Sequence, residues 1–195
     1  MQRIIDLGCG AGKWPVRLGA QPDDAMLIGI DISHQACVQA SQRDSELRWT
    51  CLCAKGEQLP LKDASVDFIF STVALPYMNI PAALREMRRV LKPGGSLDVS
   101  LHTLSFTLQD LRKNPPLMPR AFLYRLYVLA NGLWFHLTGV VARFPFSGRV
   151  ECWQSERGIK MALRKAAFEA IRCTHLPNGR FVAQALRPAS PGTNS

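Results

Sequence analysis

The chain has 195 residues, of which 47% are hydrophobic and 20% are charged. This balance excludes a disordered or fibrous protein and predicts a soluble globular domain with a substantial core. The net charge of +9 is carried by residues 103–195, which hold 13 Lys and Arg against 4 Asp and Glu. Such a one-sided charge favours an acidic substrate, an anionic lipid surface or nucleic acid, or is simply a solvated basic face.

The cysteines and the chain ends carry little signal of their own. Six cysteines occur, and none forms a C-x-x-C pair, which removes the zinc-ribbon and thioredoxin signatures. We expect buried free thiols in a cytoplasmic protein, because no secretory signal pattern is visible. No pattern of metal ligands is found, so no metal is expected. Residues 188–195, "PASPGTNS", are expected to form a disordered tail.

Apolar runs and helical spacings alternate along the first half of the chain. Ser33 is a plausible N-cap for the second helix, and "KPGG" is expected to end the third. The predicted strands are 3–8, 26–33, 47–54, 66–72 and 96–102. The predicted helices are a segment running through about Leu18, then 34–44 and 80–91. Strands that are apolar throughout and alternate with helices predict an α/β fold with a doubly wound, mostly parallel sheet.

The end of the chain departs from this alternation. A helix is predicted over 158–170, followed by strands 171–176 and 180–187 that an Asn-Gly turn would join into an antiparallel hairpin. Between the fifth strand and this helix lies a helical insertion, residues 103–156. We therefore predict a single domain over residues 1–187, with the insertion as a lid.

The segment "IIDLGCGAGK" places Asp6 before glycines at 8, 10 and 12. The P-loop pattern fails here, because it needs a glycine where Leu7 stands, and the dinucleotide pattern fails because Lys13 replaces its third glycine. Backbone without Cβ atoms lets a ligand lie close, and the Asp6 carboxylate suits a cation. Asp31, at the end of the second strand, can accept hydrogen bonds from ribose hydroxyls. A nucleoside with a positively charged tail meets these demands, and S-adenosylmethionine is such a molecule.

Four segments in order carry a family resemblance: "IIDLGCGAGKW", "IGIDIS", "GEQLPLKDASVDFIFST" and "ALREMRRVLKPGGSL". They resemble the class I S-adenosylmethionine-dependent methyltransferases, and most of all the branch with the ubiquinone and menaquinone biosynthesis methyltransferases (methyltransferase type 11). The match covers residues 3–102 well and the last helix and hairpin more loosely. It implies a Rossmann-like fold. Family members carry helices before the first strand, which this chain lacks; either the chain is truncated or the insertion covers the site.

The resemblance also implies a role for individual residues. The glycine segment would hold the methionine end of the cofactor, Asp31 the ribose, and Ile32 the adenine. Lys55 departs from the family, which has an acid there for the adenine amine; the backbone of Gly56 or Glu57 is an alternative contact. Ser71 would lie beside the methyl group. The implied cofactor-binding residues are Asp6, Gly8, Cys9, Gly10, Gly12, Asp31, Ile32, Gly56, Glu57 and Ser71.

Methyl transfer needs a base only when the acceptor atom carries a proton of high pKa. His102, at the end of the fifth strand, and Tyr77, after the fourth, are the candidate catalytic residues, because open α/β sheets bind ligands at the carboxyl ends of their strands. Both can also be structural. We expect a small and lipophilic acceptor. Two alternatives remain: a binding module without catalysis, suggested by Lys55, and a nucleic-acid methyltransferase, disfavoured because no N/D-P-P-Y/F motif follows the fourth strand.

The insertion contains "FLYRLYVLANGLWFHL", an apolar helix interrupted by Arg125 and Asn131 and therefore a poor membrane span. An apolar stripe at helical spacing runs along it, formed by Phe122, Leu126, Leu129 and Leu133. Three interpretations stay open for this stripe: a helix packed on the core, a wall for an apolar substrate, or a peripheral membrane contact through residues 121–141 and the basic C-terminal half.

Overall fold

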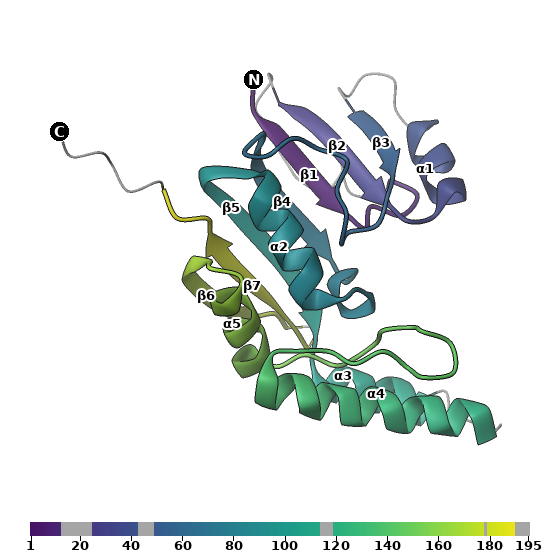
Figure 1. Ribbon diagram of the computed structural model, residues 1–195. Coiled ribbons are helices and arrows are strands. Elements are labelled where there is room, and N and C mark those ends of the chain that lie inside the picture. Colours follow the sequence, from purple (N-terminus) through teal and green to yellow (C-terminus); the bar gives the residue numbers. More distant parts are fainter. Residues whose placement is uncertain (13–24, 43–48, 114–118, 178, 190–195) are drawn as a thin grey trace.

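The chain folds around one seven-stranded sheet. The computed structural model describes residues 1–12, 25–42, 49–113, 119–177 and 179–189 (Figure 1). The strand order is β3-β2-β1-β4-β5-β7-β6; β1 to β5 are parallel, and β7 runs antiparallel to both of its neighbours, β5 and β6. The strands are β1 (Arg3–Leu7), β2 (Met26–Asp31), β3 (Trp49–Cys53), β4 (Val66–Thr72), β5 (Leu91–His102), β6 (Glu169–His175) and β7 (Arg180–Leu186). The predicted doubly wound, mostly parallel sheet with an antiparallel hairpin at its end is confirmed.

Helices of the chain connect these strands. The predicted N-cap of α1 is confirmed, because Ser33 Oγ accepts a hydrogen bond from Ala36 N at 3.2 Å. The predicted helix through Leu18 and the last six residues of the predicted tail lie outside the described residues. The described helices are α1 (His34–Ser41), the 3₁₀ helix η2 (Leu75–Tyr77), α2 (Ile80–Val90), α3 (Leu104–Lys113), α4 (Pro119–Thr138) and α5 (Glu156–Lys165).

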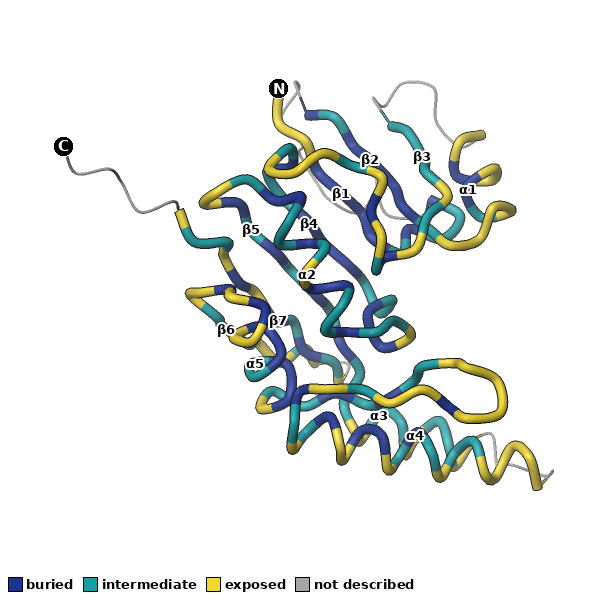
Figure 2. The backbone as a smooth tube through the Cα atoms, viewed as in Figure 1, coloured by how far each residue is buried: buried dark blue, intermediate teal, exposed yellow. Residues whose placement is uncertain are grey.

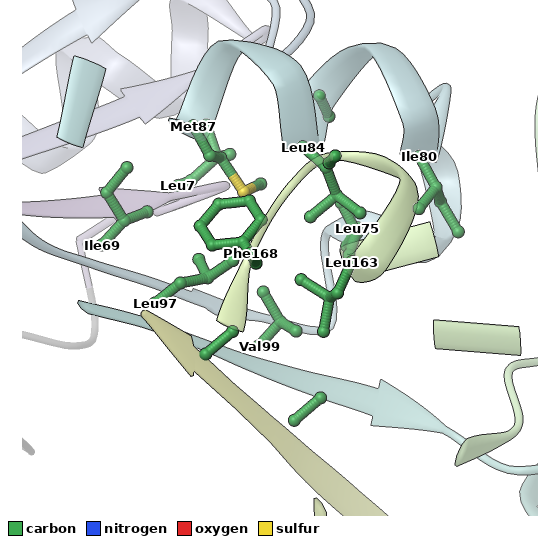
Figure 3. Close-up of a cluster of buried hydrophobic side chains, with 14 of the residues drawn as sticks. Leu7, Ile69, Leu75, Ile80, Leu84, Met87, Leu97, Val99, Leu163 and Phe168 are labelled. Atoms are coloured by element: carbon green, nitrogen blue, oxygen red, sulfur yellow. The ribbon is translucent and has the colours of Figure 1, made fainter. Parts of the chain in front are cut away.

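The hydrophobic core lies between the sheet and the pair α2 and α5. Successive residues of a strand face opposite sides of the sheet, so Ile5 belongs to this core whereas Ile4 belongs to a smaller cluster with Leu27 and Phe70. Figure 3 shows Leu84 and Met87 of α2 meeting side chains of β5 at the centre. The cluster of Figure 3 also contains Leu7, Ile69, Leu75, Ile80, Leu97, Val99, Leu163 and Phe168.

The last helix is shorter than predicted. We expected a helix through Ala170, but α5 ends at Lys165 and β6 begins at Glu169. Ala167 adopts a left-handed φ of 57°, and Phe168 N donates to Leu163 O at 3.0 Å, which closes a Schellman-type turn. Phe168 thereby turns into the core beside Leu163 (Figure 3). Burial of this phenyl ring outweighs the helical spacing of the alanines that surround it.

The fifth strand begins earlier than predicted. We expected it to start at residue 96 after "KPGG", but β5 starts at Leu91. Gly94 N donates to Arg187 O and Arg187 N donates to Gly95 O, both at 2.9 Å, so these glycines pair with the end of β7. The Arg187 guanidinium also donates to the carbonyls of Arg88 and Arg89 at the end of α2. This arginine therefore joins α2 to the sheet.

The thiols are only partly buried. All six cysteines are free, as expected, but Cys53 is exposed and Cys51 and Cys173 are of intermediate exposure, so the expectation of uniformly buried thiols is wrong. The sulfurs of Cys9 and Cys51 lie 3.6 Å apart behind the turn that follows β1. Cys53 is the last residue of β3, and its thiol donates to Ile32 O.

Candidate functional site

The glycine segment after β1 adopts a left-handed backbone conformation at three positions, Gly8, Gly10 and Gly12. Gly8 has φ +80° and Gly12 has φ +73°, a region that side-chain-bearing residues rarely adopt. Close packing adds a second constraint, because a Cβ at Gly8 would lie 2.1 Å from Ala74 Cβ and one at Gly12 would lie 3.1 Å from Ala40. Gly10, with φ +54°, differs, since a Cβ there would point into open space. The turn thus packs tightly at its two ends and leaves room at its middle.

Asp31 ties this turn to the end of β2. Its Oδ2 accepts from Gly10 N and its Oδ1 accepts from Ser33 N, both at 2.9 Å. Each carboxylate oxygen has a second lone pair available for a ligand. Asp31 and its neighbour Ile32 both line a cavity beside this turn, and Ile32 is largely exposed. The acid predicted to bind ribose therefore stands at the cavity and also organises the glycine turn.

Asp6 is a buried acid beneath the turn. It is 1% exposed, and neither carboxylate oxygen has a hydrogen-bond partner among the described residues. Burial, with a smaller contribution from the nearby Asp31 carboxylate, raises the pKa of Asp6 to about 7. An unpartnered buried carboxylate is costly unless a ligand or a cation satisfies it. Asp6 is therefore placed to respond to a positively charged group.

A cavity of about 440 Å³ opens at the carboxyl ends of β1, β2 and β4. Its volume is within the range of small-molecule sites in proteins. It is lined by residues of the glycine turn, the end of β2, the segment after β3, η2 and the start of α2. Of the residues predicted from the sequence, those that line it are Gly8, Asp31, Ile32, Gly56, Glu57 and Tyr77.

The other predicted residues lie around the cavity without lining it. Asp6, Gly10 and Gly12 belong to the strand and turn behind it. Cys9 is buried against Cys51 and donates to Gly10 O. Ser71 is buried at the end of β4, and its hydroxyl has no hydrogen-bond partner among the described residues.

His102 also stands outside the cavity lining. It ends β5, where its ring stacks on Phe106 with centroids 4.1 Å apart. Burial and the nearby Arg180 charge lower its pKa to about 4, so its imidazole is neutral at physiological pH. Its Nε2 is buried and has no partner among the residues described. Its backbone exchanges hydrogen bonds with Gln154, which tethers the end of the insertion to the sheet.

The segment after β4 is strained where it meets the turn. Val73 has a φ of +62°, a conformation that is unfavourable for a β-branched residue. Its N–H donates to Ser100 O at 3.1 Å, which holds it there. The strained residue places Ala74 against Gly8 and leads into η2, so that Tyr77 reaches the cavity. Strain of this kind is concentrated at functional sites.

Four cavity residues come from the insertion and were missed by the sequence analysis: Arg143, Gly148, Arg149 and Val150. The two arginines are exposed, as is Lys55, which also lines the cavity. Their segment is held by α4, because Tyr127 Oη donates to Ala142 O and Asn131 Nδ2 donates to Glu151 O. The only signal for them in the sequence was the basic excess of the second half, which does not single out two arginines.

The site fits S-adenosylmethionine at its methionine and ribose ends. The unpartnered Asp6 carboxylate suits an ammonium or a sulfonium, and the open space at Gly10 lets a ligand approach the backbone. Asp31 offers acceptors for hydroxyl groups. At the adenine end Lys55 supplies a donor where an amine needs an acceptor. Glu57 also lines the cavity; its Oε1 accepts from Asn79 N at 2.8 Å, and its other oxygen is a further carboxylate acceptor.

Comparison with known proteins finds similarity to methyltransferases, in agreement with a site suited to S-adenosylmethionine. Residues 5–99 match the family model described as "Methyltransferase domain". Over 185 residues, 91% of this chain, 30% are identical to the malonyl-[acyl-carrier protein] O-methyltransferase of Erwinia pyrifoliae, of which 64% is covered. The enzyme with the same name from Marinomonas sp. is 39% identical over 94 residues, 47% of this chain and 35% of that protein. The chain thus spans about one third to two thirds of these relatives.

The fold has solved counterparts. An S-adenosylmethionine-dependent methyltransferase from Methanosarcina mazei superposes with a TM-score of 0.62 at 23% identity, over 96% of this chain and 92% of that one. This likeness concerns the fold, and the family model adds the glycine segment, β2 and β4 within residues 5–99. On this evidence residues 5–99 form a methyltransferase domain, the chain has the fold of the S-adenosylmethionine-dependent methyltransferases, and the cofactor that these similarities imply is S-adenosylmethionine.

Proposed function

We propose that this chain methylates a carboxylate oxygen of a small acyl compound with an apolar body. The observation that carries the proposal is the pair Arg143 and Arg149 at the cavity mouth, on the side of Tyr77. Guanidinium groups bind carboxylates in a bidentate manner and remain charged at every relevant pH. Relatives named malonyl-[acyl-carrier protein] O-methyltransferases support the same acceptor chemistry, since a malonyl group ends in a free carboxylate.

Methylation of a carboxylate needs no general acid or base. When bound, S-adenosylmethionine would supply a methyl group on a sulfonium; a C–O bond would form while the S–CH₃ bond breaks, and its electron pair would stay on sulfur. A carboxylate is already ionised at neutral pH, so no proton has to be removed. The protein's contribution is to hold the acceptor in line with the methyl group and to exclude water. Arg143 and Arg149 would position the carboxylate for that attack.

Tyr77 is proposed to orient the acceptor. It lines the cavity, and its pKa is raised by burial and by the Glu151 and Asp110 carboxylates, which keeps the hydroxyl protonated and able to donate. For His102 the role of a base stays a prediction. Its neutral ring at the end of β5 is compatible with a positioning role through Gln154 and the end of the insertion.

The test measures transfer of labelled methyl groups from S-adenosylmethionine to a panel of monocarboxylates, dicarboxylate half-thioesters and their amides. We expect label in base-labile esters of the acids and none in the amides. The double variant Arg143→Gln/Arg149→Gln should raise KM for the acceptor at least about tenfold, because each charged hydrogen bond contributes roughly 1.5–3 kcal/mol. Arg157→Gln, an exposed arginine of α5 away from the cavity, is the matched control. An unchanged KM in the double variant would refute the acceptor assignment.

One observation favours a second function. Lys55 stands where an adenine acceptor is expected, which fits a module that keeps the fold and binds a partner without catalysis. Calorimetry with S-adenosylmethionine separates the two, because an enzyme must bind it. Heat of binding that disappears in Asp6→Asn supports the enzyme, and the absence of any heat at millimolar cofactor supports the binding module.

A further inference from the structure

Helix α4 buries both apolar and polar side chains on the side that faces the protein. Val128 and Phe135 are buried there. Asn131, only 4% exposed, donates to Glu151 O at 2.9 Å and accepts from Ala142 N at 2.8 Å. Tyr124 Oη donates to Glu151 Oε2 at 2.7 Å, and His136 Nδ1 lies 2.8 Å from Ser155 Oγ. Figure 2 shows the buried residues of α4 on the side turned toward the sheet and the exposed ones on the opposite side.

The opposite side is apolar. We define the outer face of α4 as Phe122, Leu123, Leu126, Leu133, Trp134 and Leu137, all exposed. Leu133 is 54% exposed and Trp134 is 53% exposed. At 1.5 Å per residue this face is about 22 Å long. Of the three interpretations of the stripe, packing on the core is therefore wrong for Phe122, Leu126 and Leu133. A contiguous apolar surface of this kind marks an interaction site more often than it marks chance.

Basic groups stand at both ends of the outer face. Arg120 begins α4, and Arg112 and Lys113 end α3, which the ion pair between Arg125 and Asp110 at 2.8 Å joins to α4. At the other end the ammonium of Lys165 donates to Thr138 O at 2.7 Å. Helix α4 itself contains no Asp or Glu. The surface that surrounds the apolar face is thus suited to negative charge.

We propose that the outer face of α4 docks on an anionic membrane surface. Leu and Phe side chains would enter the boundary between headgroups and acyl chains, Trp134 suits that boundary because its ring is amphipathic, and the flanking cations would pair with lipid phosphates. Helix α4 lies along the surface, and among the described helices none is long and apolar enough to cross a bilayer. A second copy fits less well, because a two-fold contact would bring the same cations together.

Docking of α4 on a membrane would also fix the position of the cavity relative to the lipid surface. On its inner side α4 holds the segment that contributes Arg143 and Arg149, through the bonds of Tyr127 and Asn131. A membrane-bound protein would therefore take its acceptor at the lipid surface. The inference does not depend on the proposed function, since membrane binding is measured without any methyl transfer.

The test is cosedimentation of the 195-residue chain with vesicles of phosphatidylcholine alone or mixed with phosphatidylglycerol. We expect binding to the mixed vesicles that weakens with salt. The variant Leu126→Ser/Leu133→Ser alters only exposed residues and should lower the partition coefficient at least about tenfold. The matched control is Leu186→Ser, an exposed leucine of β7 (38% exposed) that lies outside α4.

Other outcomes would overturn the proposal. If the double variant pellets with vesicles as much as the unaltered chain does, or if the unaltered chain pellets with neither kind of vesicle, the membrane proposal is refuted. A dimer in size-exclusion chromatography that the same double variant converts to a monomer assigns the face to a second copy. Binding of an acidic carrier protein that this variant abolishes, without vesicle binding, assigns it to that partner.

Discussion

The backbone N–H of Gly10 donates to Oδ2 of Asp31 at 2.9 Å, and this bond joins the turn after β1 to the end of β2. The two residues are 21 positions apart: Gly10 follows β1 and Asp31 ends β2, the neighbouring parallel strand. Asp31 therefore acts twice, once as a ligand-facing acid at the cavity and once as the acceptor that fixes the middle of the glycine turn. Its charge also contributes to the raised pKa of Asp6.

The ionised Asp6 carboxylate is predicted to lower the stability of the free protein while it favours cofactor binding. Its pKa is about 7 in the folded chain against an ordinary value of 3.8, so the folded state binds the proton more tightly than the unfolded one. The free energy of unfolding should therefore fall as pH rises from about 4 to about 7 and then level off, a total of up to about 4 kcal/mol. Asp6→Asn should remove this slope and stabilise the free protein at pH 8. Denaturant unfolding at pH 5 and pH 8 measures both.

The same variant should bind the cofactor poorly. The ionised carboxylate is the form that attracts a cation, so affinity for S-adenosylmethionine should rise between pH 6 and pH 8 in the unaltered chain. Asp6→Asn should lose at least about tenfold in affinity and show no such rise. A variant that is more stable and still binds with the original pH profile would contradict this role.

The glycines of the turn are predicted to differ in what they tolerate. Gly8→Ala would drive a methyl group against Ala74 and should destabilise the protein by about 2–4 kcal/mol. Gly10→Ala meets open space and should cost only about 1–2 kcal/mol, the cost of its left-handed φ. Both should weaken cofactor binding. Thermal unfolding combined with calorimetry distinguishes them, and equal destabilisation would show that the middle of the turn is as tightly packed as its start.

Lys55 is predicted to limit cofactor affinity. It lines the cavity at the position where an acid would accept a hydrogen bond from the adenine amine. Lys55→Asp should therefore tighten S-adenosylmethionine binding by about tenfold, the worth of one hydrogen bond to a charged group. Lys62→Asp makes the same charge change at an exposed residue that does not line this cavity and should have little effect. If the two variants behave alike, the gain comes from net charge and not from adenine.

Asn131 is predicted to be the anchor of the cavity-lining arginines. Asn131→Ala removes bonds to Ala142 and Glu151 from a buried position and should destabilise the protein by about 2–4 kcal/mol. The acceptor KM should rise while cofactor affinity stays unchanged, because only the 142–151 segment is loosened. Gln109→Ala, exposed on α3, should change unfolding by less than about 0.5 kcal/mol. A parallel loss of cofactor binding would show that the whole cavity depends on α4.

The amino-acid sequence by itself determined the succession of most strands and helices along the chain and the position of the glycine turn. Apolar runs, the Asn-Gly turn and the three alternate glycines are local requirements of the backbone, and they apply wherever the segment finally packs. Asp31 was found for the same reason, since the end of a strand is readable from the run that precedes it.

Only the tertiary structure decided what surrounds these elements. Helical spacing finds a stripe on α4 but does not tell which side faces the protein. Here the hydrogen bonds of Asn131 with Ala142 and Glu151, together with burial of Phe135, decide which side faces inward. Arg143 and Arg149 reach the cavity through the same long-range contacts. Burial of Phe168 likewise ended α5 earlier than its alanines predicted. Each outcome depends on residues distant in sequence, because packing and hydrogen bonding between elements outweigh local propensity.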